Sequence, residues 1–314
     1  MKSILAVMVN WNGGDLAVES ARSVLAQTSP VRLWIVDNDS KDGSLEAMAK
    51  ACPSARITRN QRNTGFAFAN NQVLRDLPPD VDWVLLVNND VILPDPGSLQ
   101  RLVESAGDDP SIQGFCGRYE YPDGRFQHFY NQLPDPLILM TQWGVLRHIP
   151  GMLTSKRMRR YAVADSDFEK PMTLEQPAFS CVLARASAVR QLGGFDEQFP
   201  IFFNDIDFCW RWRQQGWTWH YRPDWRIIHH KSTSTSRLGG LLQAEMLGSA
   251  MAFCRKHLTS GGAAAGQLAV FGEAAFRHFR HGDLGVPLRS IWHAQVMNFE
   301  RPSHRRAEPN ARAV

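Results

Sequence analysis

Residues 83–90 join an apolar run to a short polar cluster that ends in a carboxylate. Asn88, Asn89 and Asp90 follow the apolar run directly. The run predicts a buried strand, and a strand rarely ends in a carboxylate for packing reasons because an unpaired buried charge is costly. We therefore expect Asp90 to lie in a cleft at the carboxyl end of a central strand, where an aspartate can hold a divalent cation. A turn is the alternative, since this triplet also favours turns.

Three more polar clusters occur in the first 65 residues, two of them directly after predicted strands. They are Asn10-Trp11-Asn12-Gly13, Asp37-Asn38-Asp39-Ser40 and residues 60–65. Predicted strands over 4–9, 31–36, 56–58 and 83–87 alternate with predicted helices over 15–26, 44–51 and 67–74. This alternation predicts a parallel sheet with helices on both faces. Right-handed crossovers then bring the clusters to one edge, around a nucleotide-sized crevice.

Composition and missing motifs exclude several classes of protein. The 314 residues allow one large domain or two closely joined ones, and the net charge of +4 is too weak to predict a nucleic-acid partner. No G-x-G-x-x-G or G-x-x-x-x-G-K-[ST] pattern is present, which argues against a dinucleotide dehydrogenase and a P-loop phosphotransferase. Five scattered cysteines without a C-x-x-C pair predict a reducing compartment and no zinc site. No apolar run is long enough to span a membrane, so we expect a cytoplasmic protein.

The rest of the chain is less regular. We expect a strand and a helix over 179–192, a helix over 205–215, short strands over 219–221 and 226–228, and helices over 238–257 and 266–279. A mobile basic loop is expected over 150–171, facing solvent, phosphates or anionic lipid. The C-terminal helices either pack on the catalytic domain or rest on anionic lipid. The predicted parts are 1–95 (nucleotide-sugar binding), 96–235 (acceptor binding and catalysis), 236–300 (helices) and 301–314 (a disordered tail).

Eight motifs, in this order, cover residues 3–257. They are Val9-Asn10-Trp11-Asn12, the run from Val36 to Ser44, Asn63-Thr64-Gly65-Phe66-Ala67 with Asn70-Asn71, Leu86-Val87-Asn88-Asn89-Asp90, Tyr121-Pro122-Asp123-Gly124, Gly193-Gly194-Phe195-Asp196-Glu197, Asn204-Asp205-Ile206-Asp207-Phe208-Cys209, and His229-His230 with Ser232. The set resembles the family 2 glycosyltransferases, and among them the rhamnosyltransferase-like branch. The resemblance implies a GT-A fold, which is a Rossmann-like mixed α/β sheet flanked by helices. It also implies a nucleotide-diphosphate sugar donor, a divalent metal and inversion at the anomeric carbon.

The resemblance assigns donor-binding roles to the polar clusters. Asp37 would accept the ring N–H of a uracil or thymine, with helix capping or turn formation as its alternative role. Asn10 and Asn12 would line the same pocket. Asn63 and Gly65 would place amide donors near the nucleotide, before a helix that starts near residue 66. The remaining two donor-site candidates are Asn88 and Asn89.

A second set of residues would bind the metal and activate the acceptor. Asp90 matches the last residue of the family's metal-binding motif, and His229, or else His230, matches its third ligand. With one carboxylate, the diphosphate must complete the shell of Mg or Mn. Asp205 is the candidate base that removes a proton from the acceptor hydroxyl. Asp207 is the competing base, although it can pair with Arg211 one helical turn away.

These residues predict an inverting, metal-dependent glycosyltransferase. The best candidate reaction moves L-rhamnose from dTDP-rhamnose to a hydroxyl of a lipid-linked or growing cell-surface glycan. The acceptor would be a polyprenyl-diphosphate-linked saccharide at the inner membrane face, with peripheral membrane contact. The alternatives are a sugar-nucleotide nucleotidyltransferase and a non-catalytic nucleotide- or glycan-binding protein. A nucleotidyltransferase is expected to have a Gly-rich basic loop after the first strand, and here no Lys or Arg occurs there before Arg22.

Overall fold

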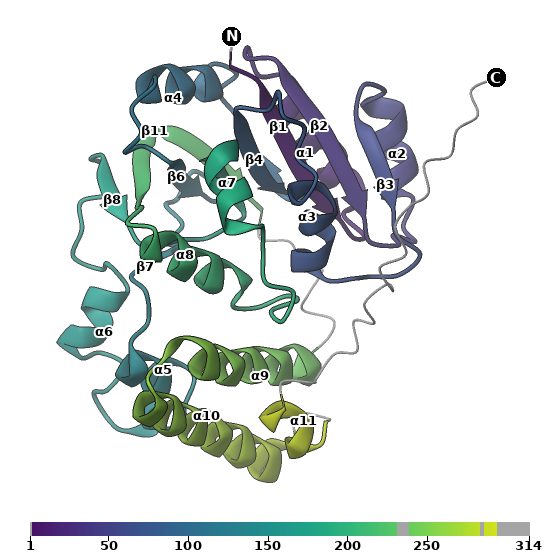
Figure 1. Ribbon diagram of the computed structural model, residues 1–314. Helices are drawn as coiled ribbons and strands as arrows, with labels where there is room; N and C mark the ends of the chain where they lie inside the picture. The colour runs from purple at the N-terminus through teal and green to yellow at the C-terminus, as the bar shows by residue number, and fades with distance from the viewer. Residues whose placement is uncertain (1, 231–238, 283–285, 294–314) are drawn as a thin grey trace.

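The computed structural model describes residues 2–230, 239–282 and 286–293. They form a mixed sheet with helices on both faces and a separate layer of helices from the C-terminal part of the chain (Figure 1). The predicted tail over 301–314 and the motif residue Ser232 lie outside the described residues.

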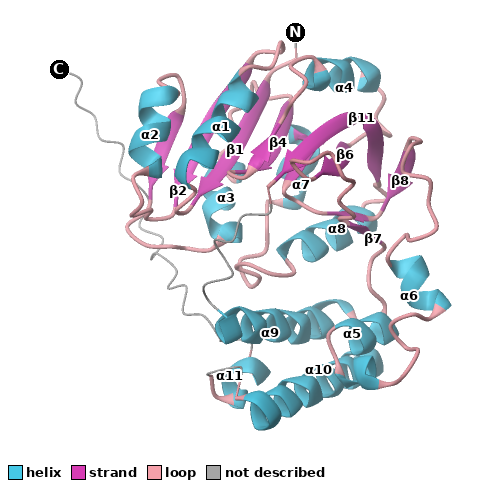
Figure 2. Cartoon of the chain, turned by 180° about the vertical axis from the view of Figure 1, so that it is seen from behind, coloured by secondary structure: helices cyan, strands magenta, loops and turns pink. Residues whose placement is uncertain are grey.

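The first half of the chain forms a parallel sheet, as predicted. Its strands are β1 (Ile4–Asn10), β2 (Val31–Asp37), β3 (Arg56–Arg59) and β4 (Trp83–Asn88), in the spatial order β3-β2-β1-β4. Helices α1 (Gly14–Leu25) and α2 (Ser44–Ala51) cover one face, and α3 (Phe66–Leu74) lies on the other (Figures 1 and 2). The strands β1, β2 and β4 therefore end at the same edge, with Asn10 paired to Asp37 and Val9 to Asn88.

The second half extends the same sheet with strands of both directions. Beyond β4 follow β10 (Cys181–Arg185), β6 (Gly114–Glu120), β11 (Trp219–His229) and β5 (Val91–Ile92), with β8 (Met172–Leu174) also paired to β11. β7 (Tyr130–Asn131) and β9 (Gln176–Pro177) form a small second sheet. The helices here are α4 (Ser98–Ala106), α7 (Ala186–Leu192) and α8 (Asn204–Gln214). The two short strands predicted over 219–228 are one strand, β11, whose pairing with β6 shifts register between Arg222 and Arg226.

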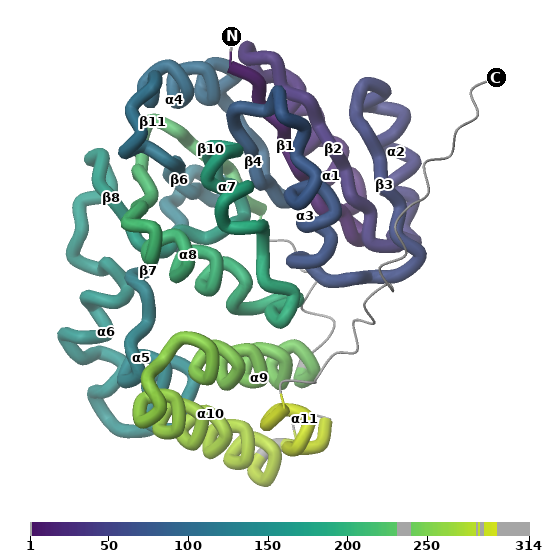
Figure 3. Tube along the Cα trace, viewed as in Figure 1, coloured from purple at the N-terminus to yellow at the C-terminus, as the bar shows by residue number. Residues whose placement is uncertain are grey.

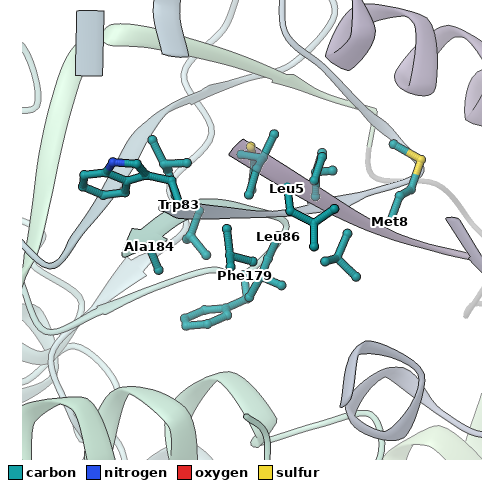
Figure 4. Close-up of a cluster of buried hydrophobic side chains, with 14 of the residues drawn as sticks. Leu5, Met8, Trp83, Leu86, Phe179 and Ala184 are labelled. Carbon is teal, nitrogen blue, oxygen red and sulfur yellow. The ribbon is translucent and has the colours of Figure 1, made fainter. Parts of the chain in front are cut away.

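The central strands are apolar along their length because both of their faces are covered. Leu5 and Met8 of β1, Trp83 and Leu86 of β4, and Ala184 of β10 pack into one buried cluster (Figure 4). This core gives the polar strand ends a rigid base.

A mobile loop over 150–171 was the wrong prediction for part of that segment. The chain forms α5 (Pro136–Gln142), a 3₁₀ turn η1 (Val145–His148) and α6 (Lys156–Tyr161). The hydroxyl oxygen of Ser155 accepts a hydrogen bond from the Met158 N–H at 3.3 Å and caps α6. Met158 and Tyr161, three residues apart on one helical face, pack with Ile138 in a small apolar cluster.

The C-terminal helices form a layer beside the sheet domain (Figure 3). They are α9 (Gly239–His257), α10 (Ser260–His281) and α11 (Leu288–Trp292), and α5 packs against α10. α10 starts at Ser260 rather than at the predicted residue 266, because its glycine- and alanine-rich first turns give a weak periodic signal. Phe253 of α9 and Val270 of α10 share a core with Phe199, Phe203 and Ile206 of the sheet domain.

Candidate active site

A cavity of about 620 Å³ lies at the edge where the parallel strands end. Its polar lining comes mainly from the sheet domain and includes Asn38, Asn63, Asn88, Asn89, Asp90, Asp205 and His229. Its apolar lining comes from segment 201–203 and from the helices around α5, α6 and α9, and includes Trp143, Tyr161, Phe202, Phe203 and Met246. Residues more than 100 positions apart thus meet in a cavity of the size that holds small-molecule ligands.

Strand pairing brings Asp90 and His229 together. Asp90 lies in the turn between β4 and β5, and antiparallel pairing sets Val91 of β5 opposite His229 of β11. The backbone N–H of His230 donates to the carbonyl of Asp90 at 3.0 Å. As a result the Nε2 atom of His229 lies 3.5 Å from Oδ1 of Asp90, and both side chains are buried at the cavity wall.

Gln127 fixes the orientation of the His229 ring. Its Nε2–H donates to the backbone carbonyl of His229 at 2.9 Å, so its Oε1 is left to accept from Nδ1 of the ring, also at 2.9 Å. In this tautomer Nε2 presents a lone pair toward Asp90. A ring nitrogen and a carboxylate oxygen so placed suit a divalent cation bound between them. His230 is not among the cavity-lining residues, so the geometry favours His229 of the two candidates.

Asp205 lines the cavity at the first turn of α8. Its Oδ1 accepts from the Ile206 N–H at 2.8 Å and its Oδ2 from Nε2 of Gln176 at 3.2 Å. Burial raises the pKa of Asp205 to about 6, although these hydrogen bonds act in the opposite direction. A carboxylate with such a pKa is ionised at neutral pH and can take up a proton, as a general base must.

Asp207, the competing base, faces away from the cavity. It is fully buried and accepts hydrogen bonds from Arg211 at 2.8 Å, from His257 at 2.7 Å and from Lys256. Burial alone would raise its pKa, but the hydrogen bond from His257 and the charges of Arg211 and Lys256 hold the pKa of Asp207 at about 2. The predicted pair with Arg211 is therefore present, and Asp207 joins α8 to α9 instead of facing the cavity.

Asp37 does not line the cavity, which corrects its predicted contact with the base. Its side chain is fully buried, and its carboxylate accepts from Nδ2 of Asn10 at 2.9 Å and from the hydroxyl and N–H of Ser40 at 2.6 and 3.0 Å. Successive side chains point to opposite sides at the end of β2, so the next residue, Asn38, lines the cavity. The Asn38 amide also accepts from the hydroxyl of Thr64 at 2.9 Å.

Asn10 and Asn12 also lie behind the cavity wall rather than in it. Oδ1 of Asn10 accepts from Nδ2 of Asn89 at 2.8 Å and thereby positions a residue that does line the cavity. Asn12 accepts from the Lys41 N–H at 2.8 Å and holds the loop after β2. The predicted role of both residues in direct donor contact is replaced by support of the wall.

Asn63 and Gly65 line the cavity, but the expected free amide donors are already used. The N–H of Gly65 donates to Oδ1 of Asn63 at 2.9 Å, and the N–H of Phe66 donates to the carbonyl of Pro200 at 2.7 Å. Gly65 has φ +80°, and a Cβ there would lie 2.8 Å from the Pro200 oxygen. The glycine is thus required for close packing against the segment before α8, and not only for a turn.

Sequence reasoning missed Gln127 and Gln176, the two glutamines that hold His229 and Asp205. Both are buried, Gln127 in the loop after β6 and Gln176 in the short strand β9. Neither belongs to a periodic pattern or to a motif, so no local signal points to them. Among the residues described, no group of three His, Cys, Asp or Glu side chains is arranged to hold a metal ion. Any metal at Asp90 and His229 therefore needs further ligands from a bound substrate.

The family model named Glycosyl transferase family 2 matches residues 5–168, more than half of the chain. The protein therefore belongs to this family and is a glycosyltransferase, which confirms the prediction made from the eight motifs. A 29% identical relative covers 68% of this chain and 71% of its own length; it is N-acetylglucosaminyl-diphospho-decaprenol L-rhamnosyltransferase of Mycobacterium tuberculosis. O-antigen biosynthesis protein RfbC of Myxococcus xanthus is 24% identical over 70% of this chain and 16% of its own.

Solved structures confirm the GT-A fold. The mannosyltransferase PcManGT from Pyrobaculum calidifontis, in complex with GDP-Man and Mn²⁺, aligns with a TM-score of 0.53 at 16% identity, over 92% of this chain and 77% of its own. The S. aureus protein TarS, residues 1–349, aligns with a TM-score of 0.51 at 14% identity, over 93% and 78% of the two chains.

Proposed function

We propose that this glycosyltransferase is an inverting, metal-dependent enzyme whose donor is a nucleotide-diphosphate sugar, with dTDP-L-rhamnose as the best candidate. One observation carries the proposal: a single cavity is lined by Asp90, His229 and Asp205, which come from three distant parts of the chain. Such a cavity offers both a cation site for a diphosphate and a base for an acceptor. The rhamnosyl donor is supported by the relative that is an L-rhamnosyltransferase.

Asp90 and His229 fit a divalent cation, and they would hold it from one side. A bound metal would supply positive charge that stabilises the leaving diphosphate. One hard carboxylate oxygen with one imidazole nitrogen suits Mn²⁺ at least as well as Mg²⁺, because imidazole favours the softer ion. PcManGT, which has the same fold, was solved with Mn²⁺.

Asp205 is proposed to act as the general base. The acceptor hydroxyl oxygen attacks the anomeric carbon, the bond from that carbon to the diphosphate oxygen breaks, and the hydroxyl proton passes to the Asp205 carboxylate. Attack opposite to the leaving group inverts the anomeric centre. Because the pKa of Asp205 is about 6, transfer should decline as the pH falls below that value.

The acceptor is proposed to be a polyprenyl-diphosphate-linked saccharide, used at the inner face of the membrane. The relative from Mycobacterium tuberculosis is named for an acceptor of this kind. Trp143, Tyr161 and Phe202 give the cavity aromatic faces on which a sugar ring can stack. No helix within residues 2–230, 239–282 or 286–293 is both long and apolar enough to cross a bilayer.

A thermal-shift panel tests the donor. dTDP-, UDP- and GDP-sugars are compared with and without Mn²⁺, and a ligand that binds only the folded protein at 100 times its Kd should raise the Tm by about 4 °C. We expect the largest shift with dTDP-rhamnose and Mn²⁺ together. Absence of any shift across the panel would show that the donor proposal is wrong. The Asp205→Asn variant should keep the shift but lose transfer, and unchanged turnover would remove Asp205 from the mechanism.

A further inference from the structure

The outward side of α10 is apolar although it faces solvent. Its exposed positions recur at the spacing of one helical face, and from Gly261 to Phe279 none of them carries a polar side chain; they are Gly261, Ala264, Ala265, Leu268, Phe276 and Phe279. Leu268 is 64% exposed and Phe279 is 80% exposed. The opposite side, with Val270 and Ala274, is buried against the other helices. A helix that is apolar all round normally lies inside a protein or in a membrane, yet α10 lies at the outer edge of its layer (Figure 3).

Neighbouring elements flank this side of α10 with further exposed apolar groups. η1 packs on one flank, where the ring of His148 lies 4.7 Å from that of Phe276, and Ile149 directly after η1 is 47% exposed. α11 packs on the other flank, where Trp292 lies 5.1 Å from Phe271 and is 37% exposed. We call Leu268, Phe276, Phe279, Ile149 and Trp292 together the outer face. Such a contiguous patch marks an interaction surface.

The elements that carry the outer face are strongly basic. Residues 136–163, 239–282 and 286–293 contain ten Lys and Arg but only two carboxylates, Glu245 and Glu273, whereas the whole chain has 35 Lys and Arg against 31 Asp and Glu. Both glutamates are buried. Three of the cations, Arg157, Arg159 and Lys256, pair with carboxylates outside these segments. Five others are exposed, namely Lys156, Arg160, Arg255, Arg280 and Arg289. Within these described ranges, the exposed charge is thus entirely positive.

We propose that the outer face docks this protein on an anionic phospholipid bilayer, with α10 lying in the plane of the interface. Exposed Leu and Phe side chains enter the acyl boundary while Arg and Lys around them meet anionic headgroups, the pattern of helices that lie on a membrane. α5 and α9, which pack on α10, carry or adjoin the cavity residues Trp143 and Met246. Docking therefore places the aromatic part of the cavity near the bilayer, which matters for the acceptor only if the proposed function holds.

A second copy of the chain is the rival occupant. In a twofold dimer the outer face would meet itself, so the exposed cations around it would be brought against their own copies. Like charges brought together oppose such a contact, whereas an anionic bilayer neutralises them. Charge complementarity therefore favours lipid.

Vesicle sedimentation tests the proposal with the full chain. Phosphatidylcholine vesicles are compared with vesicles that contain phosphatidylglycerol, at low and at high salt. We expect binding to the anionic vesicles that weakens with salt, a loss of about tenfold or more for Phe279→Asp, and a loss of about fivefold for Arg280→Glu. Ile57→Asp is the matched control, because Ile57 is an exposed apolar residue of similar size on the remote edge strand β3. This control should bind like the wild type.

The outcomes separate the possibilities. Equal sedimentation of Phe279→Asp, Ile57→Asp and the wild type overturns the docking surface. If instead Phe279→Asp converts a dimer to a monomer by light scattering without changing vesicle binding, the occupant is a second copy and the lipid proposal is wrong. Circular dichroism melts of each variant identify any loss that comes from unfolding. Since sedimentation needs no donor, a chain that binds vesicles but transfers no sugar contradicts the proposed function and leaves the docking surface intact.

Discussion

His229 takes its chemical character from one buried amide. Gln127 both donates to the backbone carbonyl of His229 and accepts from Nδ1 of its ring, so the ring can neither rotate nor change tautomer without breaking a buried hydrogen bond. This arrangement leaves Nε2 facing Asp90 as a preorganised ligand. A metal site with only two protein ligands depends on such preorganisation, because it has few other interactions to offset the entropy lost on binding.

Removing the ring should separate the two histidines. We expect His229→Ala to weaken Mn²⁺ binding in the presence of dTDP by well over tenfold, and Gln127→Met to weaken it by about 10- to 100-fold through loss of ring orientation. His230→Ala is the matched control and should retain near wild-type affinity. Titration of Mn²⁺ followed by electron paramagnetic resonance measures all three. Equal losses for His229→Ala and His230→Ala would contradict the assignment of His229.

At the residue scale, the sequence indicated which cluster lies at the cleft more reliably than which residue of it faces inward. Asp37 and Asn38 are adjacent in the same cluster, and only the pleat at the end of β2 decides that Asn38 faces the cavity. Asp90 needed no such choice because the apolar run before it fixes its place. Gln127 and Gln176 could not have been found, since their roles depend on strand pairings made far along the chain.

The helix α8 carries two aspartates with opposite fates. Asp205 and Asp207 are two residues apart, so their side chains point to different sides of the helix. One lines the cavity, and the other accepts from Arg211 of the same helix and from Lys256 and His257 of α9. The placement of the proposed base therefore depends on the contact between α8 and the C-terminal layer.

Asp207→Asn should destabilise the protein without touching the cavity. Removing one charge from a buried network leaves Arg211 and Lys256 without their shared anion, at a cost of about 3 kcal/mol. The folded pKa of Asp207 is about 2, below its ordinary value of 3.8. Its contribution is therefore fully present above pH 4 and is lost only as the pH falls through 2. Urea unfolding at pH 5 and at pH 8 should show the same loss.

The control for this experiment is Asp167→Asn. Asp167 forms an exposed pair with Lys170 at 2.9 Å, and breaking a surface pair costs less than about 1 kcal/mol. If Asp207→Asn costs no more than this control, the network does not join the two layers in the way the contacts indicate.

Elements were predicted well where a periodic apolar pattern is long, and less well where pairing partners decide the structure. The strands β1, β2 and β4 and the helices α1 and α2 were found from the sequence within a few residues. β11 was predicted as two short strands because Pro223 and Asp224 interrupt its pattern. Its pairing with β6 continues on both sides of that interruption, and only the folded sheet shows this.

At the scale of the whole molecule, two apolar cores meet under the cleft. One lies around the central strands, and the other joins the C-terminal helices to Phe199, Phe203 and Ile206 just before and within α8. The division at residues 95 and 236 remains a proposal. The shared core nevertheless shows that the C-terminal helices pack on the sheet domain through one side while α10 keeps its outer face exposed. Sequence reasoning had offered packing and lipid contact as alternatives, and opposite sides of the same layer can serve both.

The proposed base should reduce the stability of the whole molecule. Asp205 has a pKa of about 6 in the folded state against 3.8 ordinarily. The folded protein therefore holds a proton that the unfolded chain has already released, and the stability this provides is present below pH 4 and lost as the pH rises through 6. Asp205→Asn removes the cost of the buried charge. Gln176 can turn its amide so that Oε1, which has no hydrogen-bond partner, accepts from the new Nδ2–H.

We therefore expect Asp205→Asn to melt about 2–4 °C above the wild type at pH 8 and close to it at pH 4. Asp108→Asn is the control, because the Asp108 side chain is 93% exposed and its loss should leave the Tm unchanged at both pH values. Differential scanning calorimetry at the two pH values measures the effect. A variant that loses transfer and gains stability only above pH 6 would show that the carboxylate is kept buried for its chemistry. A variant equally destabilised at both pH values would show that Asp205 serves the fold instead.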